Sequence, residues 1–317
     1  MTMNGLWVLG ASDPEMTMIE VLLADGGRKY CHASIGEARV RPGTAYRADP
    51  VEGATHWVEC APVGGHPPGA VVIDHHRAGD PGFGRPPAEF MTASSLGQVL
   101  GVLGEERIAV NCSSVSGEGV YLILPGELGD DESDWPVWCL GTGFVPTELI
   151  LAAAADHCLG AAYRGECPGV DPDALMLWRA ESRSRFQGRP VEEVLADVAA
   201  TSQALLDAPR VALMSLGDMP HTEDHDWSSS VCDGCSQDPV LVADMRREPP
   251  WPELPEAGTR LGVGYISGPL VGPDGRQKFT CSGSAEQVEA FLECWGPRHG
   301  LVDMYGDPAR GFAGGYL

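Results

Sequence analysis

The chain has 317 residues, of which 43% are hydrophobic, and its formal net charge at pH 7 is −24. This length suggests two domains, because a single hydrophobic core stops growing at about 250–300 residues. A chain this acidic, without any run of lysine or arginine, is a poor ligand for duplex DNA, whereas a small phosphorylated ligand can be bound through divalent cations.

The sequence shows no feature of a secreted or membrane-bound protein. Its first apolar segment, residues 6–9, is too short for a signal sequence or a membrane span. Its ten cysteines lack the regular spacing of a small disulfide-bonded domain. We therefore expect a cytoplasmic protein with mostly reduced thiols and no membrane partner.

Strands and helices alternate in the first half of the chain. The apolar patterns predict strands at 6–10, 55–60, 71–73, 107–111 and 120–124, and helices at 16–23, 95–103 and 148–162. This alternation predicts an α/β fold, with a doubly wound, mostly parallel sheet in a domain spanning residues 1–170.

The second half begins with a helical pattern. A Gly-Arg-Pro break at 188–190 divides it into two helices, which we expect to form a linker over 171–209. A smaller α+β domain is expected over 210–317. In that domain, strands on either side of Gly-Pro-Asp-Gly at 272–275 predict a hairpin, and 284–295 predicts an amphipathic helix.

The most informative segment is Val-Val-Ile-Asp-His-His at 71–76. The apolar residues predict a buried strand, so Asp74, His75 and His76 follow its C-terminal end. Ligands of open α/β sheets bind beyond the C-terminal ends of the strands. Taken alone, these three residues are as often a polar loop as a site.

Other acids follow other strands or lie in helices. Asp13 and Glu15 follow the first strand, and Glu59 ends the second. Asp156-His157 lies in an alanine-rich helix, where a charge must be paired or ligated; Asp13 and Glu15 could instead simply favour a helix N-terminus. Carboxylate with imidazole suits Mn²⁺, with Mg²⁺, Co²⁺ or Zn²⁺ as alternatives. Two such ions, about 3.5–4 Å apart, would clamp a phosphoryl group.

The order of these motifs resembles the DHH phosphoesterase superfamily. The motifs are Asp-x-Glu at 13–15, Glu59, Asp-His-His at 74–76, Ser-Ser-x-x-Gln at 94–98, and Asp156. The resemblance covers residues 1–165 and extends, more faintly, to a C-terminal domain similar to the family's DHHA1 unit. It implies a metal-dependent phosphohydrolase, of the phosphodiesterase or pyrophosphatase type, that acts on a small nucleotide-like substrate.

The resemblance also implies a role for each position. It gives Asp13 to a first metal ion, Glu15, His75 and Asp156 to a second, and Glu59 to both. Asp74 would orient His75, and His76 would face the substrate as a phosphate donor or general acid. The family carries a His where this chain has Leu9, so His157 or Asp80 is a candidate replacement at the first ion. The alternative function is a degenerate DHH-like protein that binds a nucleotide without hydrolysis.

Further residues are candidates for substrate or metal binding. Ser94, Ser95 and Gln98 resemble a phosphate-binding helix start, with a plain helix N-cap as the alternative for Ser95. Arg164, Lys278 and Arg310 are candidate substrate contacts; a helix end, a solvated hairpin and a flexible Gly-rich tail are the respective alternatives. A structural Zn²⁺ could bind His221, His225, Cys232 and Cys235, although a polar loop also explains that segment.

Overall fold

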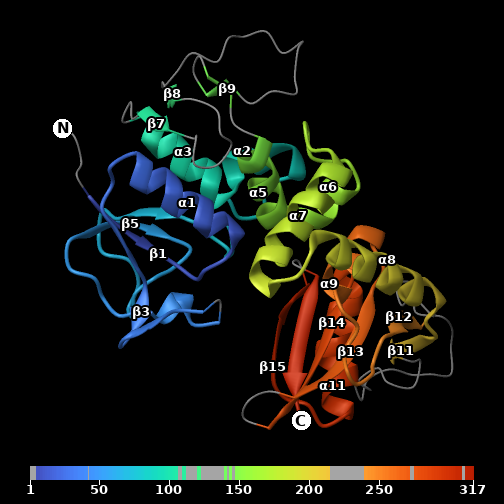
Figure 1. Cartoon of the computed structure of the whole chain (residues 1–317). Coiled ribbons are helices and arrows are strands. Elements are labelled where there is room, and N and C mark those ends of the chain that lie inside the picture. Colours follow the sequence, from blue (N-terminus) through green and yellow to red (C-terminus); the bar gives the residue numbers. More distant parts are fainter. Residues whose placement is uncertain are drawn as a thin grey trace, which may run out of the picture. The chain divides into compact units, whose positions relative to one another are not determined.

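The computed structural model describes residues 5–41, 43–105, 109–111, 120–122, 139–140, 143–144, 147–214, 239–271, 275–308 and 311–317. The contacts within the chain group into two compact units, Met1–Ser182 and Arg183–Leu317 (Figure 1). The division falls inside helix α7 (Pro172–Gln187). Of the helices in the described part of the chain, none combines the length and apolar character that crossing a bilayer needs.

The first unit contains a four-stranded parallel sheet in the order β2-β1-β5-β6. Its strands are β1 (Leu6–Leu9), β2 (Tyr30–His32), β5 (Ala54–Val58) and β6 (Val71–Ile73). The α/β class and the parallel pairing are therefore confirmed. Strand β5 ends before the predicted residue 60, because Glu59 leaves the extended conformation.

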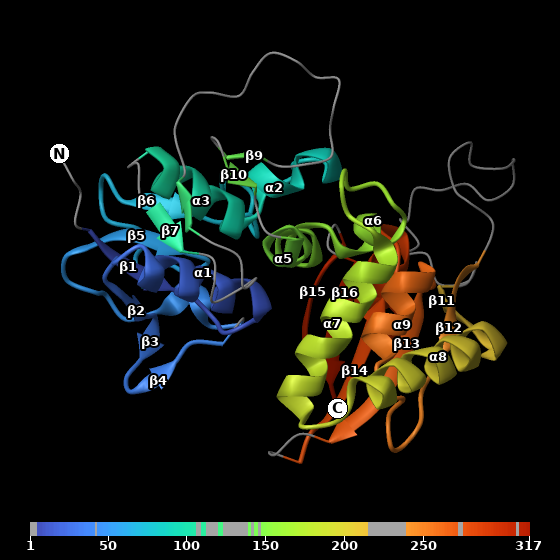
Figure 2. The same cartoon turned by 45° about the horizontal axis from the view of Figure 1, so that its top comes forward.

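The two faces of this sheet are covered differently (Figures 1 and 2). Helices α1 (Pro14–Asp25), α3 (Ser95–Glu105) and α5 (Thr147–His157) pack together on one side. On the other side, Val8 and Trp57 pack against an irregular segment between residues 31 and 51. That segment holds the short ladder of β3 (Ser34–Ile35) with β4 (Ala38–Arg39) and the turn η1 (Ala45–Arg47). Among the described residues, helices on both faces, as in a doubly wound fold, are not found.

Two further predictions for the first unit are corrected. The strands expected near 107–111 and 120–124 are β7 (Ala109–Asn111) and β8 (Val120–Leu122), which pair antiparallel with each other outside the parallel sheet. The strands β9 (Cys139–Leu140) and β10 (Gly143–Phe144) form another such pair. The helix expected over 148–162 is interrupted at Cys158, whose φ of −149° separates α5 from α6 (Leu159–Tyr163).

Short helical segments lead from β6 to α3. They are η2 (Pro87–Glu89) and α2 (Phe90–Ala93). The chain packs tightly where α2 meets α3: a Cβ on Gly97 would lie 1.4 Å from the carbonyl oxygen of Met91. Only glycine fits that contact, so Gly97 fixes how α3 begins.

The second unit is built on a mixed six-stranded sheet in the order β11-β12-β13-β14-β16-β15. Its strands are β11 (Arg210–Met214), β12 (Val240–Asp244), β13 (Tyr265–Val271), β14 (Gln277–Ser282), β15 (Val302–Asp307) and β16 (Phe312–Tyr316). The predicted hairpin is confirmed as the antiparallel pair of β13 and β14; residues 272–274 of its turn lie outside the described residues.

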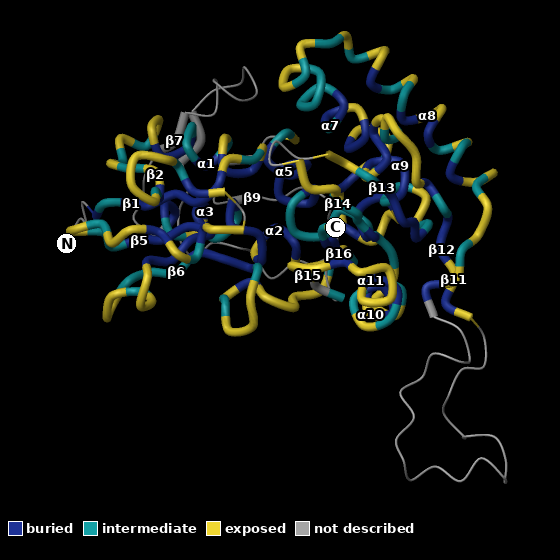
Figure 3. The backbone as a smooth tube through the Cα atoms, turned by 90° about the horizontal axis from the view of Figure 1, so that it is seen from below, coloured by how far each residue is buried: buried dark blue, intermediate teal, exposed yellow. Residues whose placement is uncertain are grey.

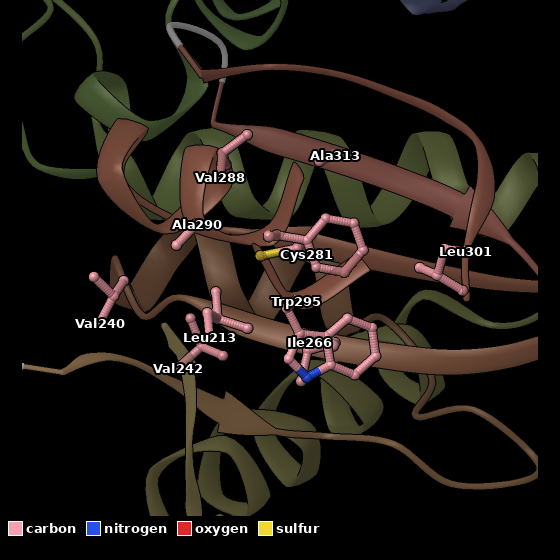
Figure 4. Close-up of a cluster of buried hydrophobic side chains, with 11 residues drawn as sticks. Leu213, Val240, Val242, Ile266, Cys281, Val288, Ala290, Trp295, Leu301 and Ala313 are labelled. Carbon is pink, nitrogen blue, oxygen red and sulfur yellow. The ribbon is translucent and has the colours of Figure 1, made fainter. Parts of the chain in front are cut away.

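Alternating strand residues supply two hydrophobic layers to this sheet. Val242 and Ile266 face a core that includes Phe291 and Trp295 (Figure 4). The intervening residues Ala243 and Tyr265 face Leu205 and Leu254. The predicted helix near 284–295 is present as α10 (Ala285–Ala290), the π-helical turn η4 (Phe291–Trp295) and α11 (Gly296–Arg298). Ser284 and Gln287 start α10 with a capping box.

The two helices predicted over 171–209 are present as α7 and α8 (Val191–Asp207). Helix α8 packs against α9 (Leu254–Leu261), and Figure 3 shows buried and exposed residues alternating along it. Its Leu205 is fully buried. Burying such a side chain contributes about 1.5–3 kcal/mol, so α8 is a packed part of the second unit. The domain boundaries at 170 and 209 stay predictions.

Candidate metal centre

The candidate site lies at the C-terminal edge of the parallel sheet. Strands β1, β5 and β6 end level with one another, since Leu9 pairs with Val58 and Val58 pairs with Ile73. The residues that follow these strands therefore meet at one edge. Glycine is needed after β1, because a Cβ on Gly10 would lie 2.5 Å from the carbonyl oxygen of Glu59.

Glu59 leaves strand β5 in the left-handed backbone conformation, with φ of 51°. For a residue with a Cβ this conformation costs about 1–2 kcal/mol. The Glu59 amide still donates to the carbonyl of Ile73 at 3.0 Å, so the hydrogen bonding between β5 and β6 continues up to Glu59. Strain of this kind is concentrated at functional sites.

Four metal-ligating side chains converge from three elements. Each offers one ligand atom, and these atoms all lie within 4.8 Å of one another; the residues are Glu59, His75, His76 and Asp156. Asp156 comes from the last turn of α5, whereas the others follow β5 and β6. Within the described ranges this is the one cluster of at least three such residues.

His75 and Asp156 have the spacing of two ligands of one ion. Nε2 of His75 lies 2.8 Å from Oδ2 of Asp156. Their relative orientation makes no hydrogen bond, and neither atom has another hydrogen-bond partner. Two donors at right angles around an octahedral ion, each about 2.1 Å from it, are about 3.0 Å apart. The observed contact matches that arrangement.

Other buried polar atoms at this place also lack hydrogen-bond partners. They are Oε2 of Glu15, Oε1 of Glu59 and Nδ1 of His75. Each unsatisfied buried group costs about 1–3 kcal/mol, and natural proteins contain few of them. Two carboxylates with two imidazoles form a donor set that suits a first-row divalent metal ion. The residues present therefore fit a metal ion.

Asp74 holds the ring of His76. Its Oδ1 accepts from Nδ1 of His76 at 2.9 Å and from the backbone amides of His75 and His76. A carboxylate behind Nδ1 leaves Nε2 as the lone-pair nitrogen, the arrangement that orients a metal-binding histidine. In the described hydrogen bonds Asp74 reaches the backbone amide of His75 and the ring of His76, so the ring that it orients is that of His76 and not the predicted one of His75.

Tyr46, which the sequence analysis missed, completes this arrangement. Its hydroxyl donates to Oδ2 of Asp74 at 2.9 Å, and the guanidinium of Arg77 lies 3.2 Å from the centre of its ring. Burial raises the pKa of the Tyr46 hydroxyl, as does the charge of Asp74. Burial opposes ionisation of Asp74 as well, but hydrogen bonds from His76 and Tyr46 lower its pKa.

Gln98 braces the strand end instead of offering its amide to a substrate. Its Nε2 donates to the carbonyl of Asp74 at 3.0 Å and to that of Ala93 at 2.7 Å, and its Oε1 accepts from the amide of Asp74. Gly82 packs closely against Ala93, which Gln98 also contacts: a Cβ on Gly82 would lie 1.9 Å from the carbonyl oxygen of Ala93. Helix α3 thus fixes the backbone of the Asp-His-His segment.

The two serines before Gln98 are fully buried. The hydroxyl of Ser94 accepts from the amide of Gly97 at 3.1 Å, so Ser94 caps the start of α3. The hydroxyl of Ser95 has no hydrogen-bond partner, yet it lies near Glu59 and lowers the pKa of that carboxyl. Of the two, Ser95 faces the cluster and Ser94 serves the helix.

Asp13 and Glu15 lie beside the four-residue cluster. Asp13 is the N-cap of α1, with Oδ1 accepting from the amide of Met16 at 2.7 Å. Glu15 is 1% exposed, and its Oε1 accepts from the amide of Leu96 at 2.9 Å. Each side chain therefore has one oxygen already engaged by the protein.

The carboxyl groups around the cluster titrate far from their ordinary ranges. Burial, and then the charge of Asp156, raises the pKa of Asp13 to about 6 and that of Glu59 to about 8. The same causes raise the pKa of Glu15 well above its usual value. Burial acts against ionisation of Asp156 too, but close contact with His75 lowers its pKa far below the ordinary range. Without a cation, Glu59 keeps its proton at neutral pH, whereas Asp13 and Asp156 are largely ionised.

The two candidate replacements at the first ion have different surroundings. Nε2 of His157 lies 3.2 Å from the carbonyl oxygen of Arg85, and its buried Nδ1 has no hydrogen-bond partner. The ring packs edge-on against that of His75, 5.1 Å between centres. Asp80 instead accepts from the backbone amide of Arg77 at 2.7 Å and so closes a turn. His157 is thus the better placed of the two.

The remaining candidates lie elsewhere or outside the described residues. Arg164 is exposed and forms a two-bond ion pair with Glu166, at 2.6 and 2.9 Å. Lys278 belongs to the second unit, where its ammonium lies 5.3 Å from the centre of the Tyr305 ring. Arg310 and the proposed zinc ligands His221, His225, Cys232 and Cys235 lie outside the described residues.

Comparison with known proteins gives no relative from which a role can be transferred. No family model, no curated protein and no solved structure matches the chain. The functional argument therefore depends on the residues and geometry of the cluster itself.

Proposed function

We propose that the chain is a divergent DHH-like phosphohydrolase that depends on a divalent metal ion, with Mn²⁺ as the preferred ion. The observation that carries this proposal is the convergence of Glu59, His75, His76 and Asp156 beyond the ends of β5 and β6. The order of the motifs along the chain supports phosphoester chemistry. The net charge of −24 favours a small nucleotide-like substrate over a nucleic-acid duplex. The cytoplasm is the compartment that we propose for the protein.

Side chains that follow β5 and β6, with one from α5, would hold the ion. Glu59, His75, Asp156 and Nε2 of His76 would be its ligands. Asp74 keeps the proton of His76 on Nδ1, so that Nε2 carries the lone pair. A divalent ion bound here would acidify a water molecule and neutralise phosphoryl oxygens.

Turnover against a panel of substrates tests this function. We expect the purified protein, supplied with Mn²⁺, to hydrolyse at least one of pyrophosphate, nucleotides, dinucleotides and cyclic dinucleotides, and we expect a chelator to abolish the reaction. Mg²⁺, Co²⁺ and Zn²⁺ serve as parallel arms. Bound metal without hydrolysis of any of these compounds would contradict the proposal.

A second function, nucleotide binding without hydrolysis, is favoured by one observation. Leu9 stands where the family has a histidine, and it is fully buried in the core, so β1 supplies no imidazole to a first ion. Asp13 is also engaged as a helix cap. Calorimetry with nucleotides selects this function if binding occurs and no divalent ion produces turnover.

Replacing Tyr46 by phenylalanine should lower kcat about tenfold, because a hydrogen bond to a charged group is worth about 1.5–3 kcal/mol. The substitution removes the bond to Oδ2 of Asp74, and Asp74 then holds the ring of His76 less firmly. KM should change little, since Tyr46 acts through Asp74. The measurement is steady-state kinetics with Mn²⁺ on the substrate found above.

Tyr30→Phe is the matched control for this prediction, because Tyr30 lies on β2, at the opposite edge of the sheet from β6. It should keep the wild-type kcat. An unchanged kcat in Tyr46→Phe would show that Tyr46 does not position His76.

A further inference from the structure

Two cysteines lie in contact next to the candidate metal centre. The sulfur atoms of Cys158 and Cys167 are 2.8 Å apart, whereas a disulfide bond is about 2.05 Å long. Both residues are present as free thiols. Cys158 is partly exposed, and Cys167 is buried. The pair therefore combines one accessible thiol with a second thiol already within reach.

The backbone on both sides of this contact is fixed by hydrogen bonds. The Cys158 amide donates to the carbonyl of Ala154 at 3.1 Å, which closes α5, and its carbonyl accepts from Ala162 at 2.9 Å, which opens α6. The Cys167 carbonyl accepts from Val170 at 3.2 Å. Because both backbones are held in place, the thiols are already positioned to react with each other.

We propose that Cys158 and Cys167 form a reversible intrachain disulfide under mild oxidation, and that this bond fixes Asp156 in its ligand position. The oxidant is a peroxide. One of the two sulfurs, as its thiolate, attacks the peroxide and breaks the O–O bond to give a sulfenic acid and, with a proton, one water; the other thiol then displaces the hydroxyl as a second water. Two thiols thus lose two electrons and two protons, and a dithiol reverses the step by exchange.

Such a bond agrees with the expected cytoplasmic location. Disulfides in that compartment are usually transient and redox-sensing. The proposal concerns this one pair. The other cysteines with described side chains, which form no disulfide, can stay reduced; they are Cys31, Cys60, Cys281 and Cys294.

The bond would act on the metal centre through the junction of α5 and α6. Asp156 lies two residues before Cys158, in the turn of α5 that the Cys158 amide closes. A disulfide at the junction restricts the positions that Asp156 can adopt, so the oxidised protein should bind the ion more tightly. By reciprocity, the ion should make the disulfide harder to reduce. This coupling rests on the proposed metal centre, whereas the cross-link does not.

Peptide mapping tests the cross-link directly. After treatment with hydrogen peroxide and alkylation of free thiols, trypsin and a glutamate-specific protease cut after Glu148, Arg164, Glu166 and Arg179. Cys158 and Cys167 then lie in the peptides 149–164 and 167–179, which contain no other cysteine. We expect these peptides to be linked, with the loss of two hydrogen atoms, and to separate in dithiothreitol. If both are alkylated, or if Cys158 is linked to another cysteine, the proposal is wrong.

Serine variants identify the pair and its effect on the metal centre. Cys158→Ser and Cys167→Ser should lose the linked peptides, and Cys294→Ser, a partly exposed cysteine of the second unit, should keep them. We measure Mn²⁺ affinity from the electron paramagnetic resonance signal of the free ion. The dissociation constant should be about fivefold lower for the oxidised wild type than for the reduced one. Equal affinities would overturn the coupling. If neither form binds Mn²⁺, the proposed function fails while the peptide map still decides the cross-link.

Discussion

Proteins carrying His75→Ala or Asp156→Asn are expected to lose Mn²⁺ binding, with a dissociation constant raised more than about 100-fold, and to lose metal-dependent hydrolysis with it. Nε2 of His75 and Oδ2 of Asp156 are 2.8 Å apart and have no hydrogen-bond partner, so removing either leaves the other unsatisfied. Residues that only support a ligand already cost about 10–100-fold in metal affinity when they are replaced. The loss of a ligand should therefore exceed that range.

The loss of metal binding should not be a loss of folding. Asp156→Asn removes the charge that raises the pKa of both Glu15 and Glu59, and it also removes the contact with His75 that lowers the pKa of Asp156. These two effects on stability oppose each other, so the metal-free Asp156→Asn protein should stay folded at neutral pH. Thermal unfolding in the presence of a chelator measures this. It separates removal of a ligand from damage to the core.

Two surface substitutions serve as matched controls. His32→Ala removes an exposed imidazole that contacts Glu20 at 3.0 Å, and Asp171→Asn changes the exposed carboxylate that caps α7. Both should keep wild-type Mn²⁺ affinity in calorimetry. Affinity within a few-fold of wild type in His75→Ala would contradict the assigned centre. Zinc that stays bound in His75→Ala would point to the segment with His221, His225, Cys232 and Cys235.

The position of the site could be predicted from the sequence because it depends on short-range rules. An apolar run followed by Asp-His-His predicts a strand end, and β-strands in a parallel sheet direct such ends to one edge. Asp156 could be found because a carboxylate in an alanine-rich helix needs a partner. The pairing of particular side chains was not predictable in the same way.

Asp74 shows why the pairing could not be read from the sequence. Consecutive residues after a strand leave in directions that depend on the local backbone, and here Gln98 fixes that backbone through hydrogen bonds to both sides of Asp74. As a result the carboxylate meets the ring of His76 and not that of His75. Gln98 was predicted as a substrate contact from the resemblance of Ser-Ser-x-x-Gln to a phosphate-binding helix start, and its hydrogen bonds to Asp74, 24 residues earlier in the chain, could not be predicted.

A related reason explains why the sequence did not indicate Tyr46 as a site residue and why β7 and β8 were expected to join the parallel sheet. Tyr46 lies in the irregular segment that covers one face of the sheet, where no apolar period marks a structural element. The β7 and β8 sequences have strand composition, but composition does not say which partner a strand takes. They pair with each other, outside the parallel sheet.

The metal-free protein should become less stable as the pH rises from about 5 to 8. Burial raises the pKa of Glu59 from 4.5 to about 8 and that of Asp13 from 3.8 to about 6. At a pH between the unfolded and the folded pKa of each acid, the acid is ionised in the unfolded chain and protonated in the folded chain. Folding therefore takes up protons, and a rising pH opposes it. Each unit of pKa shift corresponds to about 1.4 kcal/mol.

Two imidazoles act in the opposite direction. Burial lowers the pKa of His56 and His157 below the ordinary value of 6.5, so their contribution to stability grows as the pH rises through that value. The acids should dominate, because Glu59 alone shifts by several units and the pKa of Glu15 is raised as well. A fall in the unfolding midpoint of about 5 °C or more between pH 5.5 and 8 is the expected result.

Mn²⁺ should reverse this pH dependence, because it binds the deprotonated carboxylates and so replaces the protons that the metal-free protein holds. Its stabilising effect, RT ln(1 + [Mn²⁺]/Kd), should therefore be larger at pH 8 than at pH 5.5. Glu59→Gln separates the two contributions, since glutamine resembles the protonated acid: its metal-free form should be more stable than wild type at pH 8, yet gain little from Mn²⁺. A midpoint that stays level or rises with pH in the chelator-treated wild type would mean that these acids are already neutralised within the protein, and the case for a cation at this edge of the sheet would fall with it.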